Sequence, residues 1–175
     1  GAASLRGQRP APPVPALDFY EIQQIDARWC HELDSAGENG NAFADVFAPG
    51  GVLVTATGRR VEGREQLAAF AKEDPDKRKG PTNVGHYVTN LTVEATASGA
   101  RAHGYLLEAT MVAAPANGRG RGPARAVTEA NPYWEDLVRT PDGWRIKTRV
   151  IARPNAPMPA LPAVDASASA ASVSM

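Results

Sequence analysis

The sequence predicts an α+β fold in which N-terminal helices pack on a curved, mixed and mostly antiparallel sheet. Three observations support this prediction. Apolar residues first recur at helical spacings of three and four, the period changes to two from Asn83 onward, and long β-patterned segments then follow one another across short turns. A curved sheet wrapped around helices forms a cone with one open mouth, which suits a small-molecule site.

The first half of the domain is predicted to contain helices and short strands. A first helix begins near Leu17, where Asp18 and Glu21 form a capping-box pattern. Its apolar face follows helical spacing and comprises Phe19, Ile22, Ile25, Trp29 and Leu33. Further along the chain we expect a helix over 41–47, strands over 51–57 and 60–62, and a helix over 63–71.

The second half is predicted to be a meander of strands. His86, Val88 and Asn90 share one face of the first of them. Pro141-Asp142-Gly143 forms a hairpin turn, because glycine accepts the positive φ that the turn requires. The segment over 116–123 is rich in Gly and Arg and is expected to be a longer flexible loop. The expected strands span 83–90, 91–97, 100–113, 124–140 and 143–152.

Length and composition restrict the domain organisation. The 175 residues fit one domain over 17–153, between a Pro-rich tail at 1–16 and an Ala-, Ser- and Pro-rich tail at 154–175, both expected to be flexible. The apolar runs are too short for a transmembrane helix. A cytoplasmic location is expected, or a periplasmic or secreted one if the N-terminus is processed.

Charge and cysteine content also restrict function. Nineteen basic and nineteen acidic residues cancel, so no overall field favours a nucleic acid or membrane partner. The lone Cys30 is expected in the core, excludes an intramolecular disulfide and argues against a cysteine-based zinc site. With three scattered histidines, neither a metal site nor a cofactor is expected.

Three short segments each place one chemically capable polar residue among apolar ones. Asp34 closes the first helix, while His86 and Asn131 lie in β-patterned segments. An acid, an imidazole and an amide that converge in an apolar cavity can move protons without a cofactor. The unperturbed pKa of histidine, about 6.5, suits acid–base catalysis. Asp34 would orient the imidazole, and Asn131 would stabilise charge on a substrate oxygen. Asp26 is a second candidate acid.

Each of these residues also has a purely structural interpretation. A core histidine can be satisfied by a backbone carbonyl, and an aspartate can belong to the turn that ends a helix. An asparagine can occupy a bulge. For a lone histidine the structural interpretation is the more common one. The order of the three residues along the chain, which resembles that of a known enzyme family, favours catalysis.

These motifs, in this order, resemble the nuclear-transport-factor-2-like (NTF2-like) superfamily, and within it the SnoaL-like and scytalone-dehydratase-like enzymes. The resemblance spans about 17–153 and implies a cone-shaped α+β barrel in which His86 is catalytic and Asn131 faces the substrate. Two substrate-facing tyrosines of the dehydratases are absent here: Leu33 occupies the position of one, and the other would fall near Thr55. Their second histidine, which would fall near Met111 or Val112, is absent as well. The matching segments are Leu33-Asp34-Ser35, Phe47-Ala48-Pro49, Gly85-His86-Tyr87-Val88, Ala130-Asn131 with Tyr133-Trp134, and 142–146.

Six further residues are candidates for the cavity wall. Glu129 and Tyr133 share strand parity with Asn131 and should face the same space. A bulge at Pro132 would shift this parity and turn Trp134 inward instead. The candidate substrate-binding residues are Tyr133, Trp134, Glu129, Thr55, Trp29 and Glu108.

The leading interpretation is a cofactor-independent lyase that acts on a small apolar, aromatic or polyketide-like substrate. His86 would take or deliver a proton. The resemblance to the dehydratases implies elimination of water, and a retro-aldol C–C cleavage would use the same groups. The alternatives are a SnoaL-like isomerase or cyclase, a non-catalytic ligand-binding module, or an accessory subunit. Apolar residues on both faces of the long strands also predict a homodimer.

Overall fold

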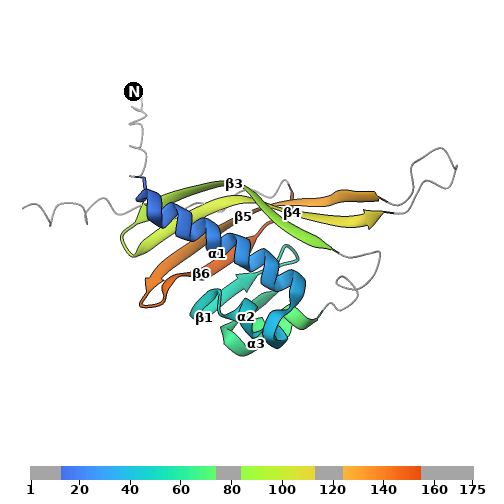
Figure 1. Cartoon of the computed structure of the whole chain (residues 1–175), viewed down its shortest axis with the longest axis horizontal. Helices are drawn as coiled ribbons and strands as arrows, with labels where there is room; N and C mark the ends of the chain where they lie inside the picture. The colour runs from blue at the N-terminus through green and yellow to red at the C-terminus, as the bar shows by residue number, and fades with distance from the viewer. Residues whose placement is uncertain (1–12, 74–83, 113–123, 155–175) are drawn as a thin grey trace, which may run out of the picture.

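A six-stranded mixed sheet packed against helices organises the chain, as a computed structural model shows (Figure 1). The structure describes residues 13–73, 84–112 and 124–154. The helices are α1 (Ala16–Ser35), α2 (Asn41–Ala44) and α3 (Gly63–Lys72), with a 3-10 turn, η1 (Gly37–Gly40), between the first two. The strands are β1 (Phe47–Val54), β2 (Arg60–Glu62), β3 (Gly85–Thr96), β4 (Gly99–Val112), β5 (Ala124–Thr140) and β6 (Gly143–Ile151).

The strand order explains why the sheet is mixed. The strands lie in the order β2-β1-β6-β5-β4-β3. Only β1 and β6 pair in parallel, and the other neighbours in this sheet are antiparallel. The predicted α+β fold with a mostly antiparallel sheet is therefore confirmed.

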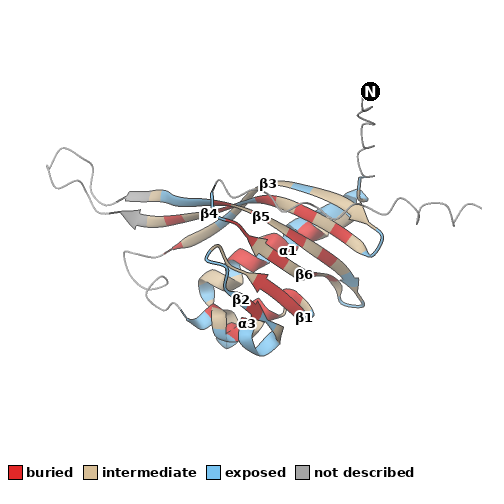
Figure 2. Ribbon diagram, turned by 180° about the vertical axis from the view of Figure 1, so that it is seen from behind, coloured by how far each residue is buried: buried red, intermediate tan, exposed pale blue. Residues whose placement is uncertain are grey.

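Helix α1 lies across one face of the sheet, while α2 and α3 gather beside β1 at one end (Figure 1). Its buried face includes Ile22, Ile25, Trp29 and Cys30, as the helical spacing predicts. Phe19 is 37% exposed because it precedes the part of the helix that the sheet covers best. Buried residues also run along β1 (Figure 2). Each large apolar side chain that is fully buried stabilises the fold by about 1.5–3 kcal/mol.

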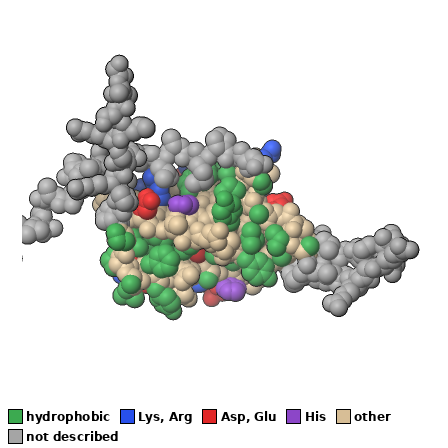
Figure 3. Space-filling view, turned by 90° about the horizontal axis from the view of Figure 1, so that it is seen from above, with side chains coloured by type: hydrophobic (Ala, Val, Ile, Leu, Met, Phe, Trp, Pro, Cys, Tyr) green, Lys and Arg blue, Asp and Glu red, His purple; other side chains and the backbone are tan. Residues whose placement is uncertain are grey.

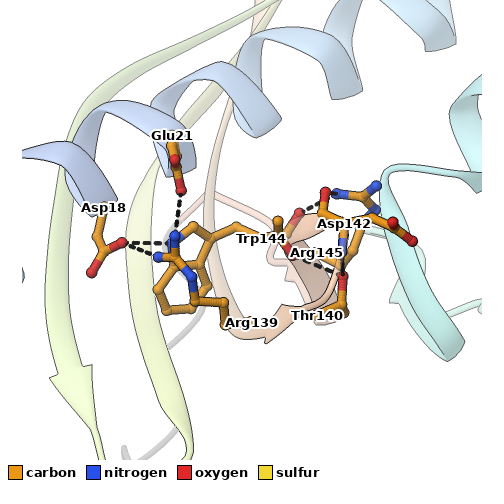
Figure 4. Close-up of polar contacts among 8 residues, drawn as sticks. Asp18, Glu21, Arg139, Thr140, Asp142, Trp144 and Arg145 are labelled. Carbon is orange, nitrogen blue, oxygen red and sulfur yellow. Dashed lines mark hydrogen bonds and ion pairs between the residues drawn. The ribbon is translucent and has the colours of Figure 1, made fainter.

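The first turn of α1 does not form the predicted capping box. Pro15 occupies the N-cap position, and no side chain caps the helix there. Asp18 and Glu21 instead both accept hydrogen bonds from Arg139, and Asp18 also accepts one from Trp144 Nε1 at 3.1 Å (Figure 4). The two acids thus attach the start of α1 to the β5–β6 hairpin, and tertiary contacts override the local pattern.

Several element boundaries differ from the prediction. The strand predicted over 51–57 runs from Phe47 to Val54. The helix predicted over 41–47 ends at Ala44, and Phe47 already begins β1. The two strands predicted over 83–97 form one strand, β3, because Asn90 adopts a left-handed φ of 55° without ending it. Asparagine tolerates this conformation better than most residues. The β3–β4 register shifts between Thr89 and Thr92, so the irregularity is a bulge within one strand.

The predicted tails over 1–16 and 154–175 lie mostly outside the described residues, as does the predicted loop over 116–123. At the first described residues, Pro13 forms an isolated β-bridge with Glu94, and Val14 packs against the core. None of the described helices is both long enough and apolar enough to cross a membrane.

Candidate active site

A cavity of about 430 Å³ lies between the C-terminal half of α1, the inner face of the sheet and the β1–β2 turn. Most of its wall is apolar, and the polar groups are concentrated on α1 and on strands β3 to β5. The main apolar lining residues are Trp29, Leu33, Phe70, Val84, Leu106 and Ile151. The polar lining residues include Asp34, His86, Glu108, Glu129, Asn131 and Thr55, together with the charged residues Arg59 and Glu73. This combination is typical of small-molecule sites.

Asp34 and His86 form a two-point contact. Asp34 lies in the last turn of α1, and its Oδ1 is 2.5 Å from His86 Nδ1. Its Oδ2 accepts a hydrogen bond from the backbone N–H of His86 at 3.0 Å. The contact assigns the proton on Nδ1 to the bond with Asp34 and leaves Nε2 for other partners. The pairing expected from the sequence is present, while its catalytic role stays a prediction.

Glu108 lies on the other side of the imidazole. Its Oε1 is 3.5 Å from His86 Nε2. His86 on β3 stands opposite Glu108 on β4, and Glu108 stands opposite Glu129 on β5. The sheet register therefore places one imidazole and two carboxylates in a row across three neighbouring strands. The sequence predicted Glu108 and Glu129 in the wall, but strand pairing was needed to reveal this row.

The two carboxylates change the charge state of His86. Burial alone would lower the pKa of His86, but hydrogen bonds to Asp34 and Glu108 outweigh it and raise the pKa to about 9. His86 is therefore an imidazolium at neutral pH. The ordinary value of about 6.5 assumed from the sequence does not hold here, because two carboxylates stabilise the charged form.

Asn131 and Glu129 complete the polar side of the cavity. Asn131 is 3% exposed, and its Nδ2 donates a hydrogen bond to Glu129 Oε2 at 2.9 Å. An amide nitrogen carries two N–H donors, so this bond uses only one of them. Because Asn131 lines the cavity, its second N–H can donate a hydrogen bond to a substrate oxygen. The predicted shared parity of Glu129 and Asn131 agrees with this arrangement.

Trp29 and Thr55 line other parts of the wall. The indole of Trp29 meets the imidazole of His86 edge to face, with ring centroids 6.2 Å apart. Thr55 contributes from the end of β1, where its Oγ1 lies 2.9 Å from Thr57 Oγ1. Both residues were predicted to contact the substrate, and both line the cavity.

Tyr133 and Trp134 are not among the cavity-lining residues. Tyr133 faces inward as its parity predicts, but it lies beneath α1 and donates a hydrogen bond to Asp26 Oδ2 at 2.8 Å. The register runs without a shift through Pro132, so the alternative in which Trp134 turns inward does not occur. Trp134 alternates with the buried residues of β5 and stands opposite His103 of β4.

A buried ionic cluster lies behind the cavity wall. Arg149 donates from Nε to Glu135 Oε2 at 2.8 Å and also pairs with Asp26. Its guanidinium lies 4.6 Å from the ring centroids of both Trp29 and Tyr133. Sequence reasoning identified Asp26 as a candidate acid but missed Glu135 and Arg149. The available signal was strand parity, since both charged residues fall at inward-facing positions of their strands.

Arg59 and Glu73, at the mouth of the cavity, were also missed. They are fourteen residues apart on different elements, and no motif connects them. Within the described ranges, no group of three or more His, Cys, Asp or Glu residues is arranged to hold a metal ion. The expectation that no metal or cofactor is needed stays a prediction.

Comparisons with known proteins agree with this fold. The sequence profile of the SnoaL-like domain matches residues 15–150. None of the curated proteins is significantly similar to the chain. An NTF2-like protein with a cystatin-like fold from Novosphingobium aromaticivorans has a TM-score of 0.65 at 20% identity, covering 81% of this chain and 84% of that one.

Two further structures come from other bacteria. Aln2 from a Streptomyces species has a TM-score of 0.66 at 24% identity, covering 81% of this chain and 94% of its own. A protein from Catenulispora acidiphila has a TM-score of 0.61 at 29% identity, covering 78% of this chain and 91% of its own. These likenesses extend over most of the chain and support the NTF2-like architecture.

Proposed function

The chain belongs to the SnoaL-like domain family, and we propose that it is a cofactor-independent lyase that uses acid–base catalysis on a small, largely apolar substrate. One observation carries the proposal: the imidazole of His86 lies between the carboxylates of Asp34 and Glu108 inside a cavity with a mostly apolar wall. A charged proton donor next to a carboxylate acceptor supplies both halves of an elimination. The apolar surroundings strengthen these interactions because they limit competing water.

In an elimination of water, His86 acts as the general acid. Its Nε2 delivers a proton to the departing hydroxyl, the C–O bond breaks and water leaves. Glu108, whose Oε1 is 3.5 Å from that nitrogen, accepts the proton from the neighbouring carbon as the C=C bond forms. Asp34 holds the imidazole in place, and Asn131 donates a hydrogen bond to the substrate oxygen on which negative charge develops.

A retro-aldol cleavage uses the same residues in a different order. Glu108 takes the proton of the substrate hydroxyl, the C–C bond breaks and a carbonyl forms on one product. His86 then protonates the carbanion or enolate of the other product. Both reactions use the same proton donor and acceptor, so the products identify which one occurs.

The decisive experiment compares the wild-type protein with the His86→Ala variant on the same pool of small apolar metabolites. We expect compounds that the wild type consumes and the variant does not, monitored by mass spectrometry. Loss of one water indicates dehydration, and two fragments indicate C–C cleavage. An unchanged mass at a new retention time indicates the isomerase or cyclase alternative.

A matched control uses His103, which hydrogen-bonds to Thr92 and does not line the cavity. The His103→Ala variant should consume the same compounds as the wild type. If neither the wild type nor this control changes any compound but both retain one, the protein is a ligand-binding module and the lyase proposal fails.

A further inference from the structure

An ion pair spans the mouth of the cavity. Arg59 lies in the turn between β1 and β2, and Glu73 directly follows α3. Arg59 Nη2 donates to Glu73 Oε1 at 2.7 Å, and a second contact joins Nη1 to Oε2. Both residues line the cavity, and their side chains are 52% and 45% exposed. The guanidinium thus presents its paired N–H groups to a carboxylate at the entrance.

The position of Arg59 is fixed by its own turn. Thr55 N–H donates to the backbone carbonyl of Arg59 at 2.9 Å, and Arg59 N–H donates to Thr55 Oγ1 at 3.2 Å. The guanidinium also lies over the ring of Phe70, 5.7 Å from its centroid. These contacts hold the backbone of Arg59 in its turn and place its guanidinium against an aromatic ring.

The charges along the cavity favour one orientation of an anionic ligand. Asp34 and Glu108 flank His86, where a second anion would be repelled, and Glu129, itself exposed, stands opposite Glu108 on the next strand. Among the described residues that line the cavity, Arg59 is the only permanently charged cation. An anionic group is therefore accommodated at the mouth, and the uncharged part of the same molecule extends toward His86.

Glu73 is a weakly held occupant of this site. It is the C-cap residue of α3, where the helix dipole disfavours a negative charge. Because both partners are about half exposed, water can solvate them when the pair opens. Replacing the Glu73 carboxylate by that of a ligand preserves the bidentate bonding of Arg59 and releases Glu73 to solvent.

We propose that Arg59 binds the carboxylate of an apolar, singly charged organic acid, and that Glu73 occupies the guanidinium when the cavity is empty. The ligand carboxylate stays at the mouth of the cavity, and the reactive carbons of the ligand extend to His86 and Glu108. This inference deepens the proposed function by naming the substrate class. Its test measures binding without turnover, so its failure would leave the acid–base proposal intact.

The test uses two probes of the same shape, 2-naphthoate and its neutral amide, 2-naphthamide. Their affinities are measured by isothermal titration calorimetry with wild type, Arg59→Gln and Glu73→Gln. We expect Arg59→Gln to weaken naphthoate binding by about fivefold or more, the usual range for a charge-assisted bidentate contact. Glu73→Gln should strengthen naphthoate binding by about threefold, since it removes the competing carboxylate. Neither substitution should change naphthamide binding by more than about twofold.

The neighbouring pair Arg60–Glu62 provides matched controls. Its N–O distance is 2.9 Å, its side chains are 59% and 52% exposed, and neither residue lines the cavity. Arg60→Gln and Glu62→Gln make the same changes in net charge and should leave both affinities unchanged. Equal losses for the two probes, equal effects of Arg59→Gln and Arg60→Gln, or weaker naphthoate binding in Glu73→Gln would each overturn the proposal. Circular dichroism confirms that every variant is folded.

Discussion

The guanidinium of Arg149 lies over the indole of Trp29, 4.6 Å from the ring centroid, and the same indole forms the cavity wall beside His86. The wall next to the candidate catalytic histidine therefore packs directly on a buried charge. Arg149 and Glu135 have side chains that are 1% and 0% exposed, so the contact between them is shielded from solvent. Trp29 thus contacts the buried charged cluster with one part of its surface and lines the cavity with another.

Removing the buried cation should destabilise the protein strongly. Arg149→Met leaves the carboxylates of Asp26 and Glu135 without their shared partner in the core. We expect a loss of about 3–5 kcal/mol in the free energy of unfolding, measured by urea denaturation. The matched change Arg60→Met, in an exposed ion pair, should cost less than about 0.5 kcal/mol. An Arg149→Met protein as stable as the wild type would show that the cluster contributes no net stability.

The stability of the protein should fall as the pH rises above neutrality. Burial raises the pKa of Glu135 to about 8, partly offset by Arg149, with Asp26 adding to the increase. A group whose pKa is raised on folding contributes stability that is complete below its unfolded value, near 4.5, and is lost as the pH passes the folded value. The contribution of Glu135 to the stability of the wild type should therefore decrease from about pH 4.5 to about pH 8 and level off above that pH, so the melting temperature should fall between about pH 7 and about pH 8.

Glu135→Gln isolates this contribution because the amide does not titrate. The variant should show a smaller decrease in melting temperature over the same pH range. The remainder belongs to His86, whose stabilising contribution is complete below about 6.5 and is lost as the pH rises through about 9. Identical pH dependence in wild type and variant would mean that Glu135 is already ionised at neutral pH.

His86 should titrate near pH 9, and Asp34 should be the main reason. The pKa of His86 can be followed directly by NMR of the imidazole, without any substrate. In Asp34→Asn the pKa should fall by about one unit or more, because the strongest hydrogen bond to the charged form is lost. The rate of a reaction that needs the imidazolium should decline above the measured pKa in each protein. A His86 pKa near its ordinary value of about 6.5 in the wild type would contradict the charge state assigned here.

Substitutions at His86 and Asn131 should lower turnover far more than stability. We expect His86→Ala to reduce kcat by about 10²–10⁴, the usual contribution of a general acid. Asn131→Ala should cost about 10²–10³, the contribution of one oxyanion donor. Thermal melting at about pH 10, roughly one unit above the pKa of His86, where the imidazole is mostly neutral, keeps its ionic contribution out of the comparison. A destabilised but fully active His86→Ala protein would assign His86 a structural role.

The predicted homodimer depends on an apolar surface that one chain leaves exposed. Tyr87, Tyr105 and Val127 are 52%, 46% and 60% exposed on β3, β4 and β5. In the view from above, hydrophobic side chains form several patches on the visible surface of the described residues, separated by backbone and other side chains (Figure 3). Light scattering should give twice the 18.5 kDa mass of one chain, and Tyr105→Asp should reduce it to one. A wild-type protein that stays monomeric at micromolar concentration would reject the dimer.

The fold was predictable because its signals are periodic. The change from helical spacing to alternation near Asn83 gave the order of elements, and the turn at Gly143 fixed the last hairpin. Local sequence patterns gave a wrong prediction where tertiary contacts compete for the same side chain. Asp18 matches a capping box, but its carboxylate forms stronger contacts with Arg139 and Trp144.

The candidate site was predictable in its residue types but incompletely in its geometry. Asp34 and His86 are 52 residues apart, and a family resemblance was needed to connect them. The pKa of His86 depends on Glu108, and strand register supplies that contact. Tyr133 was assigned to the substrate because parity gives the face of a strand but not the distance along it. Helix α1 covers the inner face of the sheet, which contains the cavity at one end and packed core residues such as Tyr133 at the other.

The central position of β6 affects how the protein folds during synthesis. This strand separates β1 from β5 in the sheet, yet it is the most C-terminal of the six. Until the ribosome has released β6, the part of the sheet that contains β1 and β2 has no strand through which to join β3–β5. The cavity takes Thr55 from the early part and Asn131 from the later one. A nascent chain therefore cannot complete its cavity before β6 is available, and folding must wait for these long-range contacts. Such a topology slows folding and exposes strand edges to aggregation.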